Sequence, residues 1–492
     1  MILPALKRFV SPENRQWLIA LIVACAFFME MLDGSVIATA LPQMAQSFHE
    51  NPVNLSIGMS AYLLTLAIFI PSSGWMADRC GSKTIFLSAI VIFTAASVLC
   101  GLSNTLLEFT AARIVQGIGG AMMVPVGRLV VLRSSDKSNL VNLIQFVTVP
   151  GLVAPVLGPP IGGFITTFSS WRWIFFLNIP IGIVGLALVV TFMVNHKAET
   201  RRAFDTLGFI LTGAGLASLL FGLDQLGRPS FDSAVTSVLI GGGAVVCVLA
   251  FLHLRRAPHP LVDLSLFRIP TFALTTLFAG TGFRIVIGTT PFLWPLMFQV
   301  GFGMSPLASG ALIIACAGGD LGMKLFARRI LRRFGFRQTL IYNGLLVALA
   351  VLACAAFGAA TPVAVIAAVL FVIGLFRSVQ FGAFNALTYV DIPPEKMSAA
   401  SSLASTIQQM SFGLGVAFGA LALHLAALWN GHGTQGFTVA DFRVAFIAAA
   451  ALAAGAAFAF TRLDPNAGAE ASGHRGQAGS PALATPKAAR TP

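Results

Sequence analysis

Stretches of about 20 apolar residues recur along the whole chain, separated by short polar segments. A helix of this length crosses the hydrocarbon core of a bilayer, because each residue adds about 1.5 Å. The pattern predicts an all-α membrane protein with fourteen transmembrane helices. The predicted spans are 17–39, 55–74, 84–102, 106–131, 141–166, 173–194, 207–225, 235–254, 271–300, 306–328, 338–359, 362–386, 400–427 and 440–461. The span 271–300 contains two prolines and could instead be divided in two.

Lys and Arg residues gather in alternate connections between these spans. The two terminal segments, with the connections and span ends expected on the same side, hold 23 of the 31 Lys and Arg residues, whereas the opposite connections and span ends hold three, Arg172, Arg228 and Arg443. Positively charged connections stay on the cytoplasmic side of a membrane. The pattern therefore predicts cytoplasmic termini, and it accounts for the net charge of +13 without a nucleic-acid partner.

The composition supports a membrane location and argues against enzymatic chemistry. Only 10% of the residues are charged and 57% are hydrophobic, whereas a soluble protein has about 25% charged residues. The six cysteines are scattered without metal-ligand spacing, and no Gly-x-x-x-x-Gly-Lys-Ser/Thr pattern is present. We therefore expect a lipid bilayer around the chain, no metal or other cofactor, no use of ATP and no enzyme activity.

The two halves of the chain share a short repeat. The sequence Asp-Arg-Cys-Gly-Ser-Lys after the second span recurs as Arg-Arg-Phe-Gly-Phe-Arg after the tenth. Aligning Gly81 with Gly335 also places Arg79 and Lys83 opposite positive residues. Parallel repeats of this kind are typical of two-bundle transporters. The predicted domains are an N-terminal six-helix bundle (1–200), two inserted helices (201–262), a C-terminal six-helix bundle (263–462) and a disordered cytoplasmic tail (463–492).

Two carboxylates, Glu30 and Asp33, lie on one face of the first span, where an acid costs several kcal/mol and indicates function by default. Asp33 lies roughly 9 Å from the outer end of its span, and Arg113 of the fourth span lies at a matching depth of roughly 10 Å. We predict that Asp33 pairs with Arg113 and exchanges a proton, because a nearby Arg favours the charged form of an acid and separation favours the neutral form. Glu30 is the second candidate for proton coupling. A frayed helix end, or an ion pair that only fastens two helices, is the alternative.

The second half has its own charges at membrane depth. Asp320 and Lys324 are spaced i, i+4 and could either neutralise each other or serve function. Arg284 and Arg377 could face a substrate or bond to carbonyls of broken helices. Three cations against one acid favour an anionic or zwitterionic substrate. The predicted lining of a substrate cavity is Gln116, Arg284, Gln299, Asp320, Lys324 and Arg377. Gln299 could instead cross-bond helices.

The segment 74–83, Gly-Trp-Met-Ala-Asp-Arg-Cys-Gly-Ser-Lys, resembles the signature loop of the major facilitator superfamily. The resemblance implies two bundles held by a latch between conformations. Gly74 would let two helices approach closely, and Asp78 would cap the next helix and pair with a cytoplasmic Arg. A plain basic turn is the alternative. The predicted latch residues are Gly74, Asp78, Arg79, Gly81 and Lys83.

The fifth span is rich in Gly and Pro between residues 150 and 163 and resembles the antiporter motif of drug exporters. Pro removes helix hydrogen bonds and Gly opens a groove, so this helix is predicted to kink and to pack closely. A bent helix that only packs is the alternative. The motif residues are Gly151, Pro155, Gly158, Pro159, Gly162 and Gly163.

Three further segments, 32–42, 113–120 and 171–180, resemble motifs of the fourteen-span drug:proton antiporter family. Within that family the resemblance is to multidrug-resistance-like exporters, through residues 122–128 and 322–324. Glu30 departs from the pattern, since many members carry a neutral residue there. The resemblance covers nearly the whole chain except its tail.

These observations together predict a monomeric exporter of the bacterial inner membrane, which exchanges small molecules for protons by rocking its two bundles. A facilitator or symporter of organic anions is the alternative within transport, and the Gly- and Pro-rich fifth span argues against it. A receptor or scaffold that no longer transports is a second alternative. Charges kept at matching depth argue against a receptor, because they cost stability and would have no use.

Overall fold

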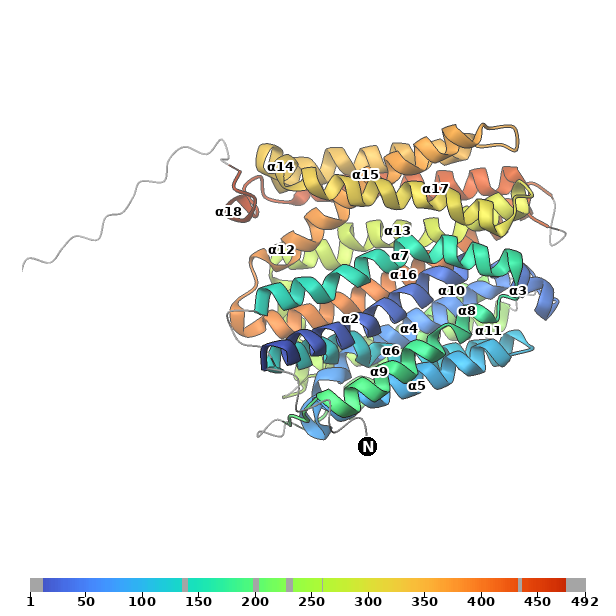
Figure 1. Cartoon of the computed structure of the whole chain (residues 1–492). Helices are drawn as coiled ribbons and strands as arrows, with labels where there is room; N and C mark the ends of the chain where they lie inside the picture. The colour runs from blue at the N-terminus through green and yellow to red at the C-terminus, as the bar shows by residue number, and fades with distance from the viewer. Residues whose placement is uncertain are drawn as a thin grey trace, which may run out of the picture.

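In the computed structural model, the chain folds into long helices that run roughly side by side (Figure 1). The structure describes residues 12–134, 140–197, 203–226, 233–258, 260–431 and 436–474. Within these ranges every regular element is a helix. Lipid offers no hydrogen-bond partners to the backbone, so apolar stretches of this length satisfy their own backbone groups as helices.

The first half of the chain forms six long helices. They are α2 (Pro12–Val36) continued by η1 (Ile37–Thr39), α4 (Ser56–Cys80), α5 (Ser82–Leu102), α6 (Leu106–Ser134), α7 (Leu140–Phe168), and α8 (Trp173–Phe176) followed by α9 (Asn178–Phe192). Two short helices, α3 (Leu41–Phe48) and η2 (Pro52–Leu55), connect the first to the second.

The second half begins with α10 (Thr206–Leu226) and α11 (Ser233–Arg256). One long span then consists of α12 (Pro270–Ala273), η4 (Leu274–Phe278), α13 (Ala279–Leu296) and η5 (Met297–Gly301), where η4 and η5 are π-helical. The remaining long helices are α14 (Pro306–Ala353), α15 (Val363–Val390), α16 (Met397–Trp429) and α17 (Val439–Ala459). The short elements are η3 (Leu264–Arg268), η6 (Cys354–Ala356), η7 (Pro394–Lys396), η8 (Phe460–Arg462) and α18 (Ala469–Ser472).

Each of the fourteen predicted spans lies on a helix of the structure. Thirteen helices among the described residues are long and apolar enough to cross a membrane, and the remaining predicted span lies on α7, which has 29 residues. α14 contributes two of them, because Gly335 breaks its helical backbone with φ 70° and ψ 174°. The span predicted at 271–300 is a single one, Pro270–Gly301.

One predicted boundary was wrong, and one short helix was not predicted. α4 continues to Cys80, so Asp78 and Arg79 lie in its last turn rather than in a loop, and Gly81 alone turns the chain with φ 100°. The sequence reading also missed α3, which has apolar side chains at helical spacing. Its buried residues are Leu41, Met44, Ala45 and Phe48.

The two halves form an N-terminal bundle (α2–α9) and a C-terminal bundle (α12–α17). We call the end of the molecule where α3 lies the α3 end, and the opposite end the α18 end (Figure 1). One apolar core joins the α3 end of the N-terminal bundle, through residues such as Val36, Phe48 and Phe175, to the C-terminal bundle. The other half of the N-terminal bundle has a separate core.

Hydrogen bonds also connect the bundles near the α3 end. Gln299 Nε2 donates to the carbonyl oxygen of Thr39 at 3.0 Å, and the amide of Leu307 donates to Thr167 Oγ1 at 3.1 Å. These bonds and the shared core close the molecule at the α3 end. The alternative in which Gln299 cross-bonds helices is therefore confirmed.

The inserted helices α10 and α11 pack against each other and cover a seam between the bundles. Leu220 of α10 forms an apolar cluster with Leu64 of α4 and Ala417 of α16. The pair therefore contacts both bundles at once.

Asp205, directly before α10, ties the inserted pair together at the α18 end. Its carboxylate lies 2.7 Å from His253 Nε2 of α11, and it accepts hydrogen bonds from the amides of Gly208 and Leu261 at 2.9 and 3.1 Å. Burial alone would raise the pKa of Asp205, but the hydrogen bonds outweigh burial and hold this pKa below its usual value.

A carboxyl group with a lowered pKa stabilises the fold above its unfolded pKa of about 4, and this contribution is lost as the pH falls through the folded pKa. We expect Asp205→Asn to destabilise the inserted pair by about 1–3 kcal/mol at pH 7 and to have a smaller effect at pH 3, below the unfolded pKa. Hydrogen exchange of the Gly208 and Leu261 amides at both pH values measures this difference. Equal protection in the two proteins at pH 7 would contradict it.

The predicted disordered tail is ordered in its first part. Residues 463–474 pack on α14, with Leu463 buried and His474 Nδ1 lying 3.1 Å from the carbonyl oxygen of Arg332. The sequence reading missed this contact because only a few small apolar residues carry it. Residues 475–492 lie outside the described residues, as does Arg228.

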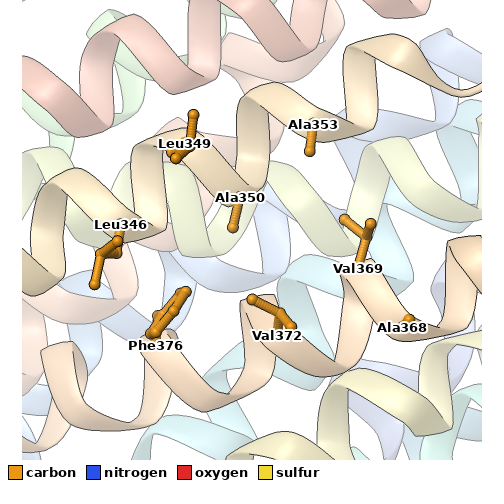
Figure 2. A pocket seen from close by; sticks show the side chains of 8 residues that line it. All are labelled: Leu346, Leu349, Ala350, Ala353, Ala368, Val369, Val372 and Phe376. Carbon is orange, nitrogen blue, oxygen red and sulfur yellow. The ribbon is translucent and has the colours of Figure 1, made fainter.

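An apolar groove lies between the second half of α14 and α15 (Figure 2). Side chains such as Leu346 and Phe376 face each other across it, and no charged or polar side chain lines it. It includes none of the predicted site residues.

Candidate functional site

The predicted ion pair between Asp33 and Arg113 is present inside the N-terminal bundle. Arg113 Nη1 of α6 lies 2.5 Å from Asp33 Oδ2 of α2. Each residue is only 1% exposed. Arg113 also stacks on Tyr62 of α4, with its guanidinium carbon 4.0 Å from the ring centroid. A buried pair of this kind is tolerated because each charge compensates the other.

A hydrogen-bond network surrounds the carboxylate. Gln116 Nε2 and Asn178 Nδ2 each donate to Asp33 Oδ1 at 2.9 Å. Both amide groups also donate to Ser97 Oγ, at 2.9 and 3.1 Å. Arg113 Nη1 donates in turn to Gln116 Oε1 at 2.6 Å. Five helices, α2, α4, α5, α6 and α9, therefore hold one acid.

The sequence reading missed Ser97 and Asn178, and it placed Gln116 in the substrate cavity. All three side chains are buried around Asp33 instead. Asn178 stands inside the motif at 171–180, and a buried amide in an apolar span is itself a signal that it has a polar partner. Ser97 carried no comparable signal, because a serine inside a helix usually bonds its own backbone.

Glu30 lies one helical turn from Asp33 and is 4% exposed. Its Oε2 atom has no hydrogen-bond partner among the described residues. The charged groups near it are Asp33 and Arg128, and Arg128 is exposed. A buried carboxylate oxygen without a partner needs a proton or a partner that arrives in another conformation. The predicted role of Glu30 in proton coupling stays a proposal.

The predicted latch lies within the N-terminal bundle. Asp78 Oδ1 accepts a hydrogen bond from Arg133 Nη2 of α6 at 2.7 Å, so its predicted pairing with an Arg is present. Asp78 does not cap α5, whose N-cap is Gly81. The guanidinium carbon of Arg79 lies 5.3 Å from the ring centroid of Trp75. The close approach expected at Gly74 is absent, because a Cβ atom there would meet nothing within 4 Å.

The same turn recurs in the C-terminal bundle. Gly81 and Gly335 both have positive φ, 100° and 70°. Lys83 Nζ donates to the carbonyl oxygen of Val190 in α9 at 2.8 Å, and Arg337 Nη2 donates to that of Thr461, after α17, at 2.9 Å. Each positive side chain therefore ties its turn to the last helix of its own bundle. The alignment of the two segments is confirmed in three dimensions.

The glycines of the antiporter motif lie where α7 meets two other helices. A Cβ atom on Gly158 or Gly162 would collide with Ser35 or Val36 of α2, and one on Gly163 would collide with Pro306 of α14. Close packing of α7 is therefore confirmed. The helix is continuous through all its prolines from Leu140 to Phe168. Of the other motif residues, Pro155 is exposed and Pro159 is buried.

The substitution Gly162→Ala is expected to destabilise the protein by about 1–3 kcal/mol, because the new methyl group meets the rigid carbonyl of Val36. Gly151→Ala is the matched control on the same helix, since a Cβ atom there would meet only Met31 Cγ at 3.9 Å. Thermal unfolding in lipid nanodiscs measures both. Equal melting temperatures for the two variants would contradict the contact.

Arg284 bonds to a broken helix, which was one of its two predicted roles. It is 1% exposed, and Nη1 donates to the carbonyl oxygen of Thr275 at 2.7 Å while Nη2 donates to Asn385 Oδ1 at 3.1 Å. Thr275 lies in the π-helical segment η4, where the regular pattern of backbone bonds is interrupted. The guanidinium group therefore satisfies backbone that the span leaves open, instead of lining a cavity.

Asp320 pairs with Arg377 of α15, and not with Lys324. Arg377 Nη2 lies 2.9 Å from Asp320 Oδ2, and their side chains are 21% and 31% exposed. Lys324 is exposed and has no hydrogen bond or ion pair with the described residues. The alternative in which Asp320 and Lys324 neutralise each other was wrong, because an arginine on the neighbouring helix pairs with the carboxylate.

Comparisons with known proteins agree with this architecture. A family model of the Major Facilitator Superfamily matches residues 23–416. The chain is 39% identical over 455 residues to the putative multidrug resistance protein MdtD of Escherichia coli O6:H1, an alignment that covers 92% of this chain and 96% of that protein. The protein of the same name from Shigella boydii serotype 18 is also 39% identical over 455 residues, with the same shares covered.

Solved structures share the fold at low sequence identity. The peptide transporter POT in complex with sulfate has a TM-score of 0.66 at 12% identity, over 92% of this chain and 95% of that one. The D-xylose-proton symporter has a TM-score of 0.61 at 15% identity, over 89% and 96%. The fold, the family match and the curated relatives agree, and the chain belongs to the major facilitator superfamily.

Proposed function

We propose that this membrane protein exports small molecules in exchange for protons. The observation that carries the proposal is the buried pair of Asp33 and Arg113, which five helices hold in one network. A charged pair at membrane depth costs stability, and its use by default is the passage of ions or substrate. The multidrug resistance relatives support export of small molecules as the purpose.

Protonation of Asp33 is the step that drives the exchange. A neutral Asp33 no longer attracts Arg113, and the amides of Gln116 and Asn178 lose their charged acceptor at the same time. The network therefore has two arrangements, one for each protonation state. Glu30 is the second proton site, since one of its carboxylate oxygens has no partner among the described residues while Asp33 is paired.

The change at Asp33 reaches the seam between the bundles through α2 and α7. Ser35 and Val36 follow Asp33 on α2 and lie against the glycines of α7, and Gly163 of α7 lies against Pro306 of α14. A shift of α2 must therefore move α7 against the C-terminal bundle, because helices packed this closely cannot move independently. The structure corresponds to a state closed at the α3 end, and the Asp78–Arg133 pair changes its surroundings as the bundles rock.

The protein resides in the bacterial inner membrane as a monomer, with both termini and the α18 end on the cytoplasmic side. The distribution of Lys and Arg supports this orientation. Its substrates are small molecules, its coupling ion is the proton, and the helices contact lipid. The predicted domain boundaries stand as part of the proposal. The family is one of transporters, so no enzymatic step is included.

Proton movement in liposomes tests the proposal. The purified protein is reconstituted around the pH dye pyranine, and ethidium, dansylate or dansylamide is added outside. An antiporter raises the internal pH as a substrate enters, a symporter lowers it, and a receptor without transport leaves it unchanged. The first result is expected with at least one probe. Acidification with every transported probe, or no response to a wider panel of drugs, rules out the exchange.

A further inference from the structure

We propose that Lys324, next to the Asp320–Arg377 pair, binds the negative group of an amphipathic organic anion. The inference rests on the proposed transport function and assigns a substrate class to it. It starts from one observation, a lysine that ends the apolar span Pro306–Lys324, is exposed and has no partner among the described residues. An ionisable residue in a membrane span faces the interior of the protein or a water-filled path, so the direction in which Lys324 faces decides its use.

The position of Lys324 on α14 places it on the side of the other bundle. Lys324 follows Pro306 by 18 residues, about five helical turns, so both lie on one face. Near the α3 end, α7 covers this face, where Pro306 lies against Gly163 and Gly310 against Pro159. Lys324 therefore lies on the same face of α14 that faces α7 further along.

Exposure rises along this face toward the α18 end. Gly310 is buried and Ala317 is 8% exposed, whereas Lys324 is exposed. On α7 the same change occurs, from buried Pro159 to exposed Pro155. The two helices thus meet near the α3 end and leave their facing surfaces uncovered further along. In a structure closed at the α3 end, such a surface lines the path that opens at the other end.

The local charge on this face is positive. Arg377 and Asp320 compensate each other in a pair at 2.9 Å, so Lys324 adds a net charge of one. About 14 residues of α14 precede Asp320, which places the pair roughly 21 Å from the start of the helix, in the half of the span toward the α18 end. A negative group at Lys324, one turn further on, would lie beside protein on one side, where attraction is stronger than in bulk water.

The partner chemistry follows from the surroundings. On the same face of α14, Ala317 and the 41% exposed Leu321 lie within two turns of Lys324 and are apolar. A ligand for this surface has one acidic group for the ammonium and an apolar body for the rest. A small inorganic anion lacks the apolar body, and an organic cation would be repelled by Lys324.

Equilibrium binding without a proton gradient tests the inference. The full chain in nanodiscs is titrated with dansylate, a naphthalene sulfonate that keeps its negative charge at all working pH values, and with dansylamide, its neutral counterpart. We expect dansylate to bind at least about tenfold more tightly, which corresponds to about 1.4 kcal/mol. The preference should disappear in Lys324→Gln and persist in Lys324→Arg.

Two further variants separate charge from structure. Arg329→Gln removes one positive charge from the same helix, but Arg329 is exposed about 140° around the axis from Lys324. It should keep the full preference. Asp320→Asn removes the negative partner of Arg377. It should tighten dansylate binding severalfold and leave dansylamide binding unchanged. A pair with only a structural role would not produce this gain in affinity.

The inference is wrong if the wild-type protein does not prefer dansylate, if Lys324→Gln keeps the preference, or if Lys324→Gln weakens both probes equally. These outcomes leave proton exchange untouched, because no gradient is present. Conversely, preference for dansylate without proton exchange in the pyranine assay would support the anion site and contradict the proposed transport function.

Discussion

Asp33→Asn is expected to abolish uphill, proton-driven transport while substrate binding and downhill exchange remain. The amide side chain introduced by this substitution keeps an acceptor for Gln116 or Asn178 but carries no charge and cannot take up a proton. The variant therefore stays in the arrangement of the neutral acid, in which Arg113 is released. A transporter that cannot change protonation state has no means of using the proton gradient.

The measurement is accumulation of a transported probe in proteoliposomes with an imposed pH difference. Uphill accumulation should fall to the level of protein-free liposomes, and counterflow without a gradient should persist. Glu50→Gln, at an exposed position of the α3 end, is the matched control and should transport normally. Gradient-driven accumulation by Asp33→Asn would exclude Asp33 as the coupling site.

Arg113→Met is expected to destabilise the protein by about 3–5 kcal/mol, because it leaves the carboxylate of Asp33 buried without its partner. Met has a similar length and adds no charge, so the loss is electrostatic rather than a cavity. Gln116 Oε1 also loses the Arg113 donor and keeps only the weak donor of the Cys100 thiol. Unfolding of the protein in nanodiscs by heat or denaturant measures the change.

The double variant Asp33→Asn with Arg113→Met distinguishes a charge effect from a packing effect. Removing both charges leaves no unpaired ion, so much of the lost stability should return. If the double variant loses as much stability as the two single variants together, Asp33 and Arg113 do not interact energetically. The same result would weaken the proposed coupling mechanism, which depends on their attraction.

The spans were predictable because, in lipid, the length and apolar composition of a segment are sufficient to predict a membrane-spanning helix. A backbone without water must bond to itself, so a run of about 20 apolar residues becomes a helix wherever it stands in the chain. The predicted end at Thr39 and the predicted break near Gly335 both match the structure. The matching depth of Asp33 and Arg113 followed from the same regular rise.

The partners of the remaining polar residues were not predictable in this way. Lys324 stands one turn from Asp320 in the sequence, yet Arg377 takes the carboxylate from a neighbouring helix. Arg284 finds the carbonyl of Thr275 only because the backbone is π-helical there. Helical spacing describes contacts within one helix and contains no information about the rotation of its neighbours.

The sequence by itself determined the number, length and order of the helices, the repeat of the two turns, and the pair at the centre of the N-terminal bundle. Only the tertiary structure decided that Ser97, Gln116 and Asn178 complete that pair and that Lys324 has no partner among the described residues. The physical reason is that burial in lipid depends on each segment's own composition, whereas a hydrogen bond depends on how two helices are rotated against each other.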